Sequence, residues 1–420
     1  MTRTATGRAA RPPLSLALGC VGFLASPALA DDAAQTNVEQ REDREIVVTG
    51  ERPERELESP KTTAPLLDTP QTVTVISDQT LRRQNLLTLR DALSIVPGIT
   101  FGAGEGGGGY GDSINLRGYS AGSDVTQDGV RDSAQYSRTD PFNLQQIEVY
   151  NGSNSVFNGA GSVGGTINLV SKVPQAEDLS VLSASVGIDD YYRPTPDTNQ
   201  RVSDLVAVRL NAMWHRNDYP GRDVEEFHRW GVAPAITLGI GSLTSLTLAY
   251  VHQSDDNIPL YGVPFFLSQL GDGPLPEADD SDYFGYRNLD EQDLVVDRVT
   301  ATLNHDFSER ASVRNLTRWQ RVGALTQASA PQGTYCLSDT GRQPVPANAS
   351  ATVGLLCPAG LAPGFFRPSG PHGRVRDQVN HLLHTQTDLR IESGRSGSLH
   401  NTLVVGGSMS WENYRIETAE

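Results

Sequence analysis

Gly159, Gly161 and Gly164 have the spacing of a motif that binds phosphate groups. In the order Gly-x-Gly-x-x-Gly, such glycines hold a dinucleotide pyrophosphate when a strand precedes them and a helix N-terminus follows. Here the following residues, Thr166–Val170, are rich in β-branched side chains and alternate in polarity, which predicts a second strand in place of that helix. The context that would confirm a nucleotide site is therefore missing.

The other reactive side chains offer little for catalysis. The sequence contains no Ser-centred nucleophile elbow, no His-Glu-x-x-His pair and no phosphate loop ending in Lys. His381 and His384 are three residues apart, and on a strand this spacing points them to opposite faces, where they make poor co-ligands. We therefore predict neither an enzyme nor a metal site.

Two short strands must position the glycine-rich loop. Ile147 and Val149 before it, and Ile167 and Leu169 after it, alternate with polar residues. The whole stretch, residues 141–172, resembles the end of the plug domain of TonB-dependent outer-membrane receptors, in which a strand of the type IEV leads through a glycine-rich turn into GGTINLVSK. The resemblance implies a plugged transporter of the outer membrane.

Composition is compatible with that membrane. Only 37% of the 420 residues are hydrophobic, and the mean hydropathy is −0.36. No apolar run of about eighteen residues follows the N-terminus, so we expect no membrane helix. The low mean hydropathy does not exclude a transmembrane β-barrel. A barrel strand places apolar residues at every second position only, so its average hydropathy is low.

Residues 1–30 have the pattern of a signal peptide. Three arginines precede an apolar core, and Ala28-Leu29-Ala30 precedes two aspartates, so we expect cleavage after Ala30. The remaining chain carries 31 basic and 50 acidic residues, which argues against a nucleic-acid partner. Residues 31–59 are then expected to form a flexible periplasmic segment.

That segment contains one β-prone run, which resembles the TonB box. It consists of Glu45, Ile46, Val47, Val48, Thr49 and Gly50. An extended apolar peptide of this kind can add a strand to another protein's sheet. The resemblance implies that TonB, the energy-transducing protein of the inner membrane, binds here; the alternative is an ordinary strand of the following domain.

Residues 60–175 are predicted to form a mixed α/β plug domain. Thr72–Ile76 alternates as a strand, and Ser77 caps a helix that we expect to run through Leu89 to Val96-Pro97-Gly98. Asp128-Gly129 predicts a tight hairpin turn. These residues match the plug segments TPQTVTVI, LRDAL and VPGI of the receptor family almost continuously.

Residues 176–420 are predicted to form the N-terminal part of an antiparallel transmembrane β-barrel. Long segments alternate between apolar and polar residues, as outer-membrane strands do, whereas the strands of a soluble β-sandwich would be shorter. We expect about eight strands: 179–193, 203–218, 229–241, 242–255, 293–308, 311–328, 376–393 and 399–417. Plugged transporters have about 22 strands, so we expect a truncated receptor or a decayed copy.

Two cysteines remain after removal of the signal peptide. Cys336 and Cys357 lie close together in a stretch rich in proline, glycine and alanine. In an exported chain this predicts a disulfide within an outer loop, and no histidine at ligand spacing favours a metal pair instead.

The resemblance also suggests which residues contact the ligand. The candidates are aromatic or basic residues at the plug apices and in a long outer loop: Tyr110, Tyr119, Arg131, Tyr136, Tyr261, Phe265 and Phe266. Aromatic rings stack on ligand rings and Arg pairs with anions, although several of these tyrosines would serve equally well to pack the plug against the barrel.

A second set of residues concerns the latch between plug and barrel. The family usually has basic residues on both sides of the IEV strand, where Gln146 and Asn151 stand here. We therefore expect the latch to rest on Arg117 and Glu148.

The outer loop Tyr261-Gly262-Val263-Pro264 and the segment from Asp297 to Phe307 resemble the catecholate siderophore branch of the family. This implies a monomeric receptor, surrounded by outer-membrane lipid, that binds TonB and a ferric siderophore. Iron would be carried as the siderophore complex, with no cofactor of the protein's own. Cobalamin, haem or another large solute, or a non-transporting fragment with a binding plug, are the alternatives.

Overall fold

The fold was analysed in a computed structural model. It describes residues 57–102, 112–122, 124–132, 134–136, 138, 140–155, 163–268, 271–275, 278–329, 332–345, 352–370, 375–394 and 399–419. The described residues all belong to one compact unit, Glu54–Glu420. The predicted signal peptide, the TonB box and Tyr110 lie outside the described residues.

The plug, which we define as residues 57–172, contains a five-stranded sheet in the order β1-β7-β8-β5-β6. Its strands are β1 (Val73–Ser77), β5 (Val125–Gln127), β6 (Val130–Arg131), β7 (Leu144–Asn151) and β8 (Gly165–Ser171). β5 pairs with β8 in parallel and the other pairs are antiparallel. Strands therefore lie on both sides of the glycine-rich loop, as the alternation predicts.

The plug has two short helices where the sequence predicts one. α1 (Asp78–Arg83) begins at Ser77, whose side chain accepts a hydrogen bond from the Thr80 amide. α2 (Leu89–Ser94) begins at Thr88 with a capping box. The break follows from Asn85, whose φ of 52° is left-handed and cannot continue a helix. No helix in the described residues is long and apolar enough to span a membrane.

One buried apolar cluster holds the plug together. It joins both helices to the large sheet and to a small sheet of β2 (Ile99–Phe101), β3 (Ile114–Leu116) and β4 (Tyr119–Ser120). A 3-10 turn, η1 (Leu66–Asp68), precedes β1. The β5–β6 turn is the predicted hairpin, with Asp128 and Gly129 at φ of 51° and 78°, as a type I′ turn requires.

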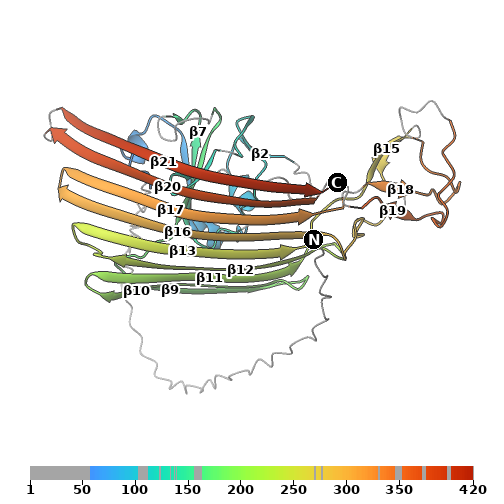
Figure 1. The fold of residues 1–420 in the computed structure, drawn as a ribbon, viewed down its shortest axis with the longest axis horizontal. Coiled ribbons are helices and arrows are strands. Elements are labelled where there is room, and N and C mark those ends of the chain that lie inside the picture. Colours follow the sequence, from blue (N-terminus) through green and yellow to red (C-terminus); the bar gives the residue numbers. More distant parts are fainter. Residues whose placement is uncertain are drawn as a thin grey trace, which may run out of the picture. The chain divides into compact units, whose positions relative to one another are not determined.

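The rest of the chain forms an antiparallel sheet of nine strands, here called the wall (Figure 1). Neighbours along the sheet follow chain order, from β9 at one end to β21 at the other. The strands are β9 (Leu179–Val186), β10 (Tyr192–Ser203), β11 (Val206–Asp218), β12 (Glu226–Leu238), β13 (Thr244–Asn257), β16 (Glu291–Ser308), β17 (Ala311–Gln327), β20 (Val375–Gly394) and β21 (His400–Ala419).

The wall has nine strands where the sequence predicts about eight, and the strand that the prediction did not separate is β10. The segment expected at 179–193 is β9 together with a turn and the start of β10. Pro194 and Pro196 obscure β10, because proline lacks an N–H and is rare inside sheets. In the structure both prolines pair with residues of β9. On the β11 side, residues 193–196 have no paired residue, because the register continues from Tyr192 to Asp197.

The wall has one apolar and one polar face. Leu210, Trp214 and Trp230 are exposed, as are Trp319 and Trp411. The alternate positions carry buried polar side chains: Arg209, Asn211, Arg298, Arg318, Gln320 and Asp388. Apolar, tryptophan-bearing outer faces and polar inner faces are the pattern of an outer-membrane barrel.

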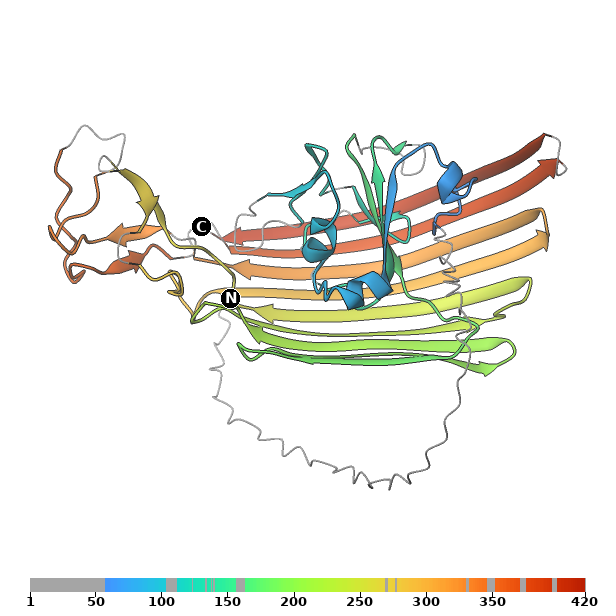
Figure 2. The same ribbon diagram turned by 180° about the vertical axis from the view of Figure 1, so that it is seen from behind.

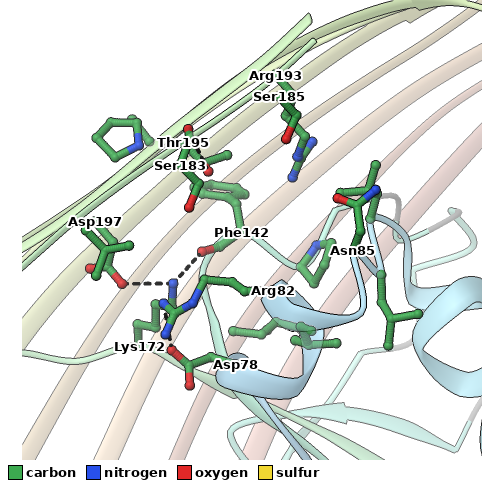
Figure 3. Close-up of a pocket in the computed structure, with 18 residues that line it drawn as sticks. Asp78, Arg82, Asn85, Phe142, Lys172, Ser183, Ser185, Arg193, Thr195 and Asp197 are labelled. Atoms are coloured by element: carbon green, nitrogen blue, oxygen red, sulfur yellow. Dashed lines mark hydrogen bonds and ion pairs between the residues drawn. The ribbon is translucent and has the colours of Figure 1, made fainter. Parts of the chain in front are cut away.

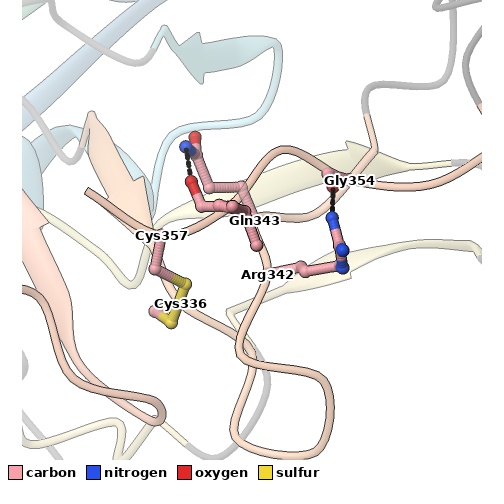
Figure 4. Close-up of a disulfide and its surroundings, with 6 residues drawn as sticks. Cys336, Arg342, Gln343, Gly354 and Cys357 are labelled. Atoms are coloured by element: carbon pink, nitrogen blue, oxygen red, sulfur yellow. Dashed lines mark hydrogen bonds between the residues drawn. A yellow bond between two sulfur atoms is a disulfide. The ribbon is translucent and has the colours of Figure 1, made fainter. Parts of the chain in front are cut away.

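Two long connections at one end of the wall carry small hairpins. β14 (Phe265–Ser268) pairs with β15 (Gly271–Pro274), and β18 (Gly333–Tyr335) pairs with β19 (Phe366–Pro368). A disulfide joins Cys336 to Cys357 with the Cα atoms 5.6 Å apart (Figure 4). It closes the second of these loops, which is where the sequence predicts it.

Candidate functional site

The candidate site is the contact between the plug and the inner face of the wall. Figure 2 shows the helices and strands of the plug against one face of the long sheet. Five contacts there involve charged side chains of the plug.

Asp128 in the β5–β6 turn makes the central contact, with Arg318 of β17. Arg318 Nη2 donates to Asp128 Oδ2 at 2.6 Å, and its Nη1 donates to the Gln127 carbonyl at 2.6 Å. The Ser171 amide and hydroxyl also donate to this carboxylate. Burial alone would raise the pKa of Asp128, but Arg318 and the Ser171 donors outweigh it and lower that pKa.

Asp132 makes the second contact. Gln320 of β17 donates to Asp132 Oδ1 at 3.1 Å, and Arg298 of β16 orients Gln320 through its Oε1 at 2.7 Å. Within the plug, Arg138 pairs with Asp132 at 3.1 Å and the Tyr136 hydroxyl donates to it at 2.9 Å. Burial opposes the charge, yet Arg138 keeps the pKa of Asp132 below its usual value.

Asp140 makes the third contact and has no exposed side-chain surface. Arg193 of β10 donates to both of its oxygens at 2.7 and 2.8 Å, and Arg229 of β12 lies 3.3 Å away. Such bidentate, charge-assisted pairs are the stronger kind of ion pair. Burial would raise the pKa of Asp140, but Arg193 and Arg229 lower it.

The fourth contact holds the C-terminal end of the plug. Lys172 Nζ lies 3.0 Å from Asp197 Oδ2 of β10, and Arg209 of β11 donates to both Asp197 oxygens at 2.9 Å. Arg209 also donates to the Val173 carbonyl at 3.0 Å. Figure 3 shows Lys172 and Asp197 beside a cavity of about 130 Å³ between α1 and β9–β10.

The fifth contact holds the N-terminal end of the plug. Arg314 of β17 donates from Nη2 to Glu58 Oε1, and Arg390 of β20 donates to the Thr62 carbonyl at 2.8 Å. The backbone amide of Glu58 donates to Glu148 Oε1 in β7 at 2.8 Å. This end is therefore tied both to the wall and to the plug sheet.

The latch expected at Arg117 and Glu148 is not the one observed. The hydrogen bonds found for Glu148 come from Gln146, Tyr150, Asn168 and the Glu58 amide, all within the plug. The Arg117 side chain is exposed. Four plug carboxylates, Glu58, Asp128, Asp132 and Asp140, instead accept from wall arginines or glutamine. Only the pair of Lys172 with Asp197, among the five contacts, joins a plug cation to a wall acid.

The predicted ligand residues fall into three groups. Tyr119 is 56% exposed and Arg131 is exposed, so both are accessible. Tyr136 is not, because it is buried against Val296 and Val322 of the wall and serves packing. Tyr261 is half-buried, and its carbonyl accepts from Arg222. For Phe265 and Phe266 the structure describes only the backbone.

Sequence reasoning missed the acidic residues of the plug. Their signal lay in the partners: Arg193, Arg229 and Arg318 occupy inward positions of wall strands, where each cation needs a counter-charge once a domain covers it. Nothing in the local pattern of Asp128, Asp132 or Asp140 distinguishes them from ordinary turn residues.

Comparison with known proteins gives consistent matches. Residues 65–166 match the TonB-dependent Receptor Plug Domain. A probable TonB-dependent siderophore receptor, PiuA of Acinetobacter baumannii, is 39% identical over 264 residues, 62% of this chain and 35% of that protein. The catecholate siderophore receptor Fiu of Escherichia coli K12 is 35% identical over 319 residues, 72% of this chain and 41% of that protein.

Solved structures agree. The closed form of the ferric-catecholate import receptor Fiu from E. coli K12 superposes with a TM-score of 0.73 at 29% identity, covering 86% of this chain and 49% of that one. The siderophore receptor PiuA from A. baumannii gives 0.71 at 30% identity, with the same coverage. The chain thus spans between about a third and a half of the length of these relatives.

Proposed function

Because the chain belongs to the TonB-dependent receptors of the bacterial outer membrane, we propose that it provides the plug and part of the barrel of an importer for a ferric siderophore, most specifically of the catecholate type. The observation that carries the proposal is the plug held on the polar face of a membrane-type wall by buried ion pairs. The likeness to a catecholate siderophore receptor over 72% of the chain supports the choice of ligand.

The energy source follows from the compartment. The outer membrane has no ATP with which to move a plug, so the work must come from a protein of the inner membrane that reaches the periplasmic side. Glu45–Gly50 precedes the plug and has the composition of a peptide that adds a strand to a partner's sheet. We assign this segment to the contact with TonB.

Ligand recognition is assigned to the accessible residues of the plug. A ferric catecholate complex carries negative charge and aromatic rings, which suit Arg131 and Tyr119 respectively. Both side chains are exposed. Iron travels inside the ligand, and the ion pairs of the site hold the plug rather than catalyse a reaction.

Binding and uptake with single iron sources test the proposal. A strain deleted for the receptor is supplied with a ferric catecholate, a ferric hydroxamate, haem or cobalamin, and growth under iron or cobalamin limitation is compared with that of the complemented strain. We expect a defect on ferric catecholate alone. A defect on haem or cobalamin would assign that cargo instead, and equal growth on every source would refute the proposal.

A further inference from the structure

Glu58 joins three parts of the chain through one residue. Its backbone amide donates to Glu148 in the middle of the plug sheet, and its carboxylate accepts from Arg314 of the wall. It lies eight residues after Gly50, the end of the predicted TonB box. Any displacement of the segment before Glu58 therefore reaches the plug sheet and the wall at the same residue.

The partner inside the plug is unusual. Glu148 is completely buried, yet the four donors found for it are neutral: the Gln146 and Asn168 amides, the Tyr150 hydroxyl and the Glu58 N–H. Among the described residues, Gln146 and Glu58 are the donors to Oε1. Displacement of Glu58 takes one of these two hydrogen bonds away, so the position of the N-terminal segment directly affects β7.

The Glu58 side chain is 18% exposed, but one of its two carboxylate oxygens is shielded from water. Its Oε2 is buried and has no hydrogen-bond partner among the described residues. Arg314 faces it from β17, Asp128 from the β5–β6 turn and Glu148 from β7. Lys61 of its own segment lines a small cavity together with Arg314 and Asp128. Burial and the two acidic neighbours outweigh Arg314 and raise the pKa of Glu58 to about 7.

We propose that Glu58 is a positioning residue for transport, which holds the N-terminal segment on the plug sheet and the wall until a periplasmic partner withdraws it, and whose proton occupancy sets the strength of that hold. The inference rests on the proposed function, because it gives the segment before the plug a role in transport.

The sign of the pH effect follows from linkage. The pKa of Glu58 is higher in the attached state than the ordinary value of 4.5, so attachment takes up a proton. The hold is fully present below pH 4.5 and is lost as the pH rises through about 7, because the buried carboxyl group then becomes charged and gains hydration by leaving. A shift from 4.5 to about 7 predicts that the ratio of detached to attached segment rises about tenfold between pH 6 and pH 8.

A nitroxide label tests this directly. Pro53→Cys places a label five residues before Glu58 in the receptor, inserted in outer-membrane vesicles, where the disulfide leaves no competing thiol. The ratio of mobile to immobile label is read by electron paramagnetic resonance at pH 6, 7 and 8. We expect the tenfold rise in the otherwise unchanged receptor, and an unchanged ratio across this range would overturn the proposal.

Three variants separate titration from packing. Glu58→Gln keeps the shape and removes the titration, so the ratio should become independent of pH. Arg314→Gln removes the cation that lowers the pKa of Glu58, so the rise should move to higher pH. Glu177→Gln makes the same chemical change at an exposed residue and should leave the profile as it was. A pH profile retained by Glu58→Gln would assign the effect to another group and reject Glu58.

The same vesicles also keep the two proposals apart. Binding of ferric catecholate to the labelled receptor tests the proposed function and does not require Glu58. Binding without a pH-dependent segment would reject only the role of Glu58, whereas a pH-dependent segment without binding of any siderophore would reject only the assigned cargo.

Discussion

The two ends of the plug are attached to the wall in different ways. At the C-terminal end, Lys172, Asp197 and Arg209 have side chains 7%, 7% and 1% exposed. There, Asp197 of the wall pairs with Lys172 of the plug and is fixed in place by two hydrogen bonds from Arg209 of its own sheet. At the N-terminal end, Glu58 and Arg314 are 18% and 21% exposed, and the ion pair is a single contact.

This difference has an energetic consequence. Removing one partner of a buried, multiply bonded pair leaves a charge without compensation and costs about 3–5 kcal/mol. A pair with partial access to water is screened, and its loss costs about 1 kcal/mol or less. The C-terminal end of the plug is therefore a fixed anchor, whereas the N-terminal end is an attachment that can be released.

The largest effect should come from the segment that would do the releasing. Deletion of Ile46–Thr49 should abolish uptake of the ferric siderophore while leaving its binding intact, because we assign the segment to the contact with TonB and not to the ligand. Uptake of radioactive iron and equilibrium binding on whole cells measure the two quantities. Loss of binding would mean instead that the segment is part of the folded plug.

The next effect should come from a buried acidic residue between the two ends. Asp140→Ala removes the carboxylate that pairs with Arg193 and Arg229 and should destabilise the plug by about 3–5 kcal/mol. Calorimetry of the detergent-solubilised receptor measures it. Asp339→Ala, at an exposed carboxylate of the outer loop, is the matched control and should change little.

The disulfide should stabilise the outer loop without affecting the attachment of either end of the plug. Replacing Cys336 and Cys357 by Ser opens a loop with a sequence separation of 21 residues, which lowers the stability of the outer loop by about 3 kcal/mol in the chain-entropy model. Limited proteolysis should cut between residues 336 and 357 sooner, with plug fragments unchanged. Earlier cleavage of the plug as well would show that the loop supports it.

The smallest effect should come from Arg314. Arg314→Gln should lower plug stability by about 1 kcal/mol or less, because the pair with Glu58 is partly exposed. The same calorimetric measurement applies. A loss as large as that of Asp140→Ala would remove the distinction between the two ends.

Much of the fold could be predicted because it depends on local periodicity. Alternation located eight of the nine wall strands, and Ser77 and Asp128-Gly129 marked a helix cap and a hairpin. Pro194 and Pro196 concealed β10. A strand can contain proline where no neighbouring strand accepts a hydrogen bond from that position, and the sequence does not show which positions these are. Asn85 divided the expected helix through its backbone conformation, which side-chain periodicity does not reveal.

The site could be predicted far less. Glu148 was singled out as part of the latch, but it belongs to a buried network within the plug. Glu58 lies in a polar stretch where nothing in the sequence distinguishes it from Glu54 or Glu56. Its role depends on Arg314, which is 256 residues away in the chain. Contacts between residues so far apart in the sequence form when the plug packs against the wall. The alternation of polar and apolar residues along the chain does not encode how the two pack together.

Hydrogen exchange in the presence of the periplasmic domain of TonB tests the central claim most directly. A peptide covering residues 57–66 reports the N-terminal end of the plug through the hydrogen-bonded amide of Glu58. A peptide covering residues 170–178 reports the C-terminal end through the hydrogen-bonded amides of Lys172 and Gln175. We predict that TonB accelerates exchange of the first peptide at least tenfold and leaves the second unchanged. Equal acceleration of both peptides, or acceleration of the second alone, would contradict a plug that is anchored at its C-terminal end and released at its N-terminal end.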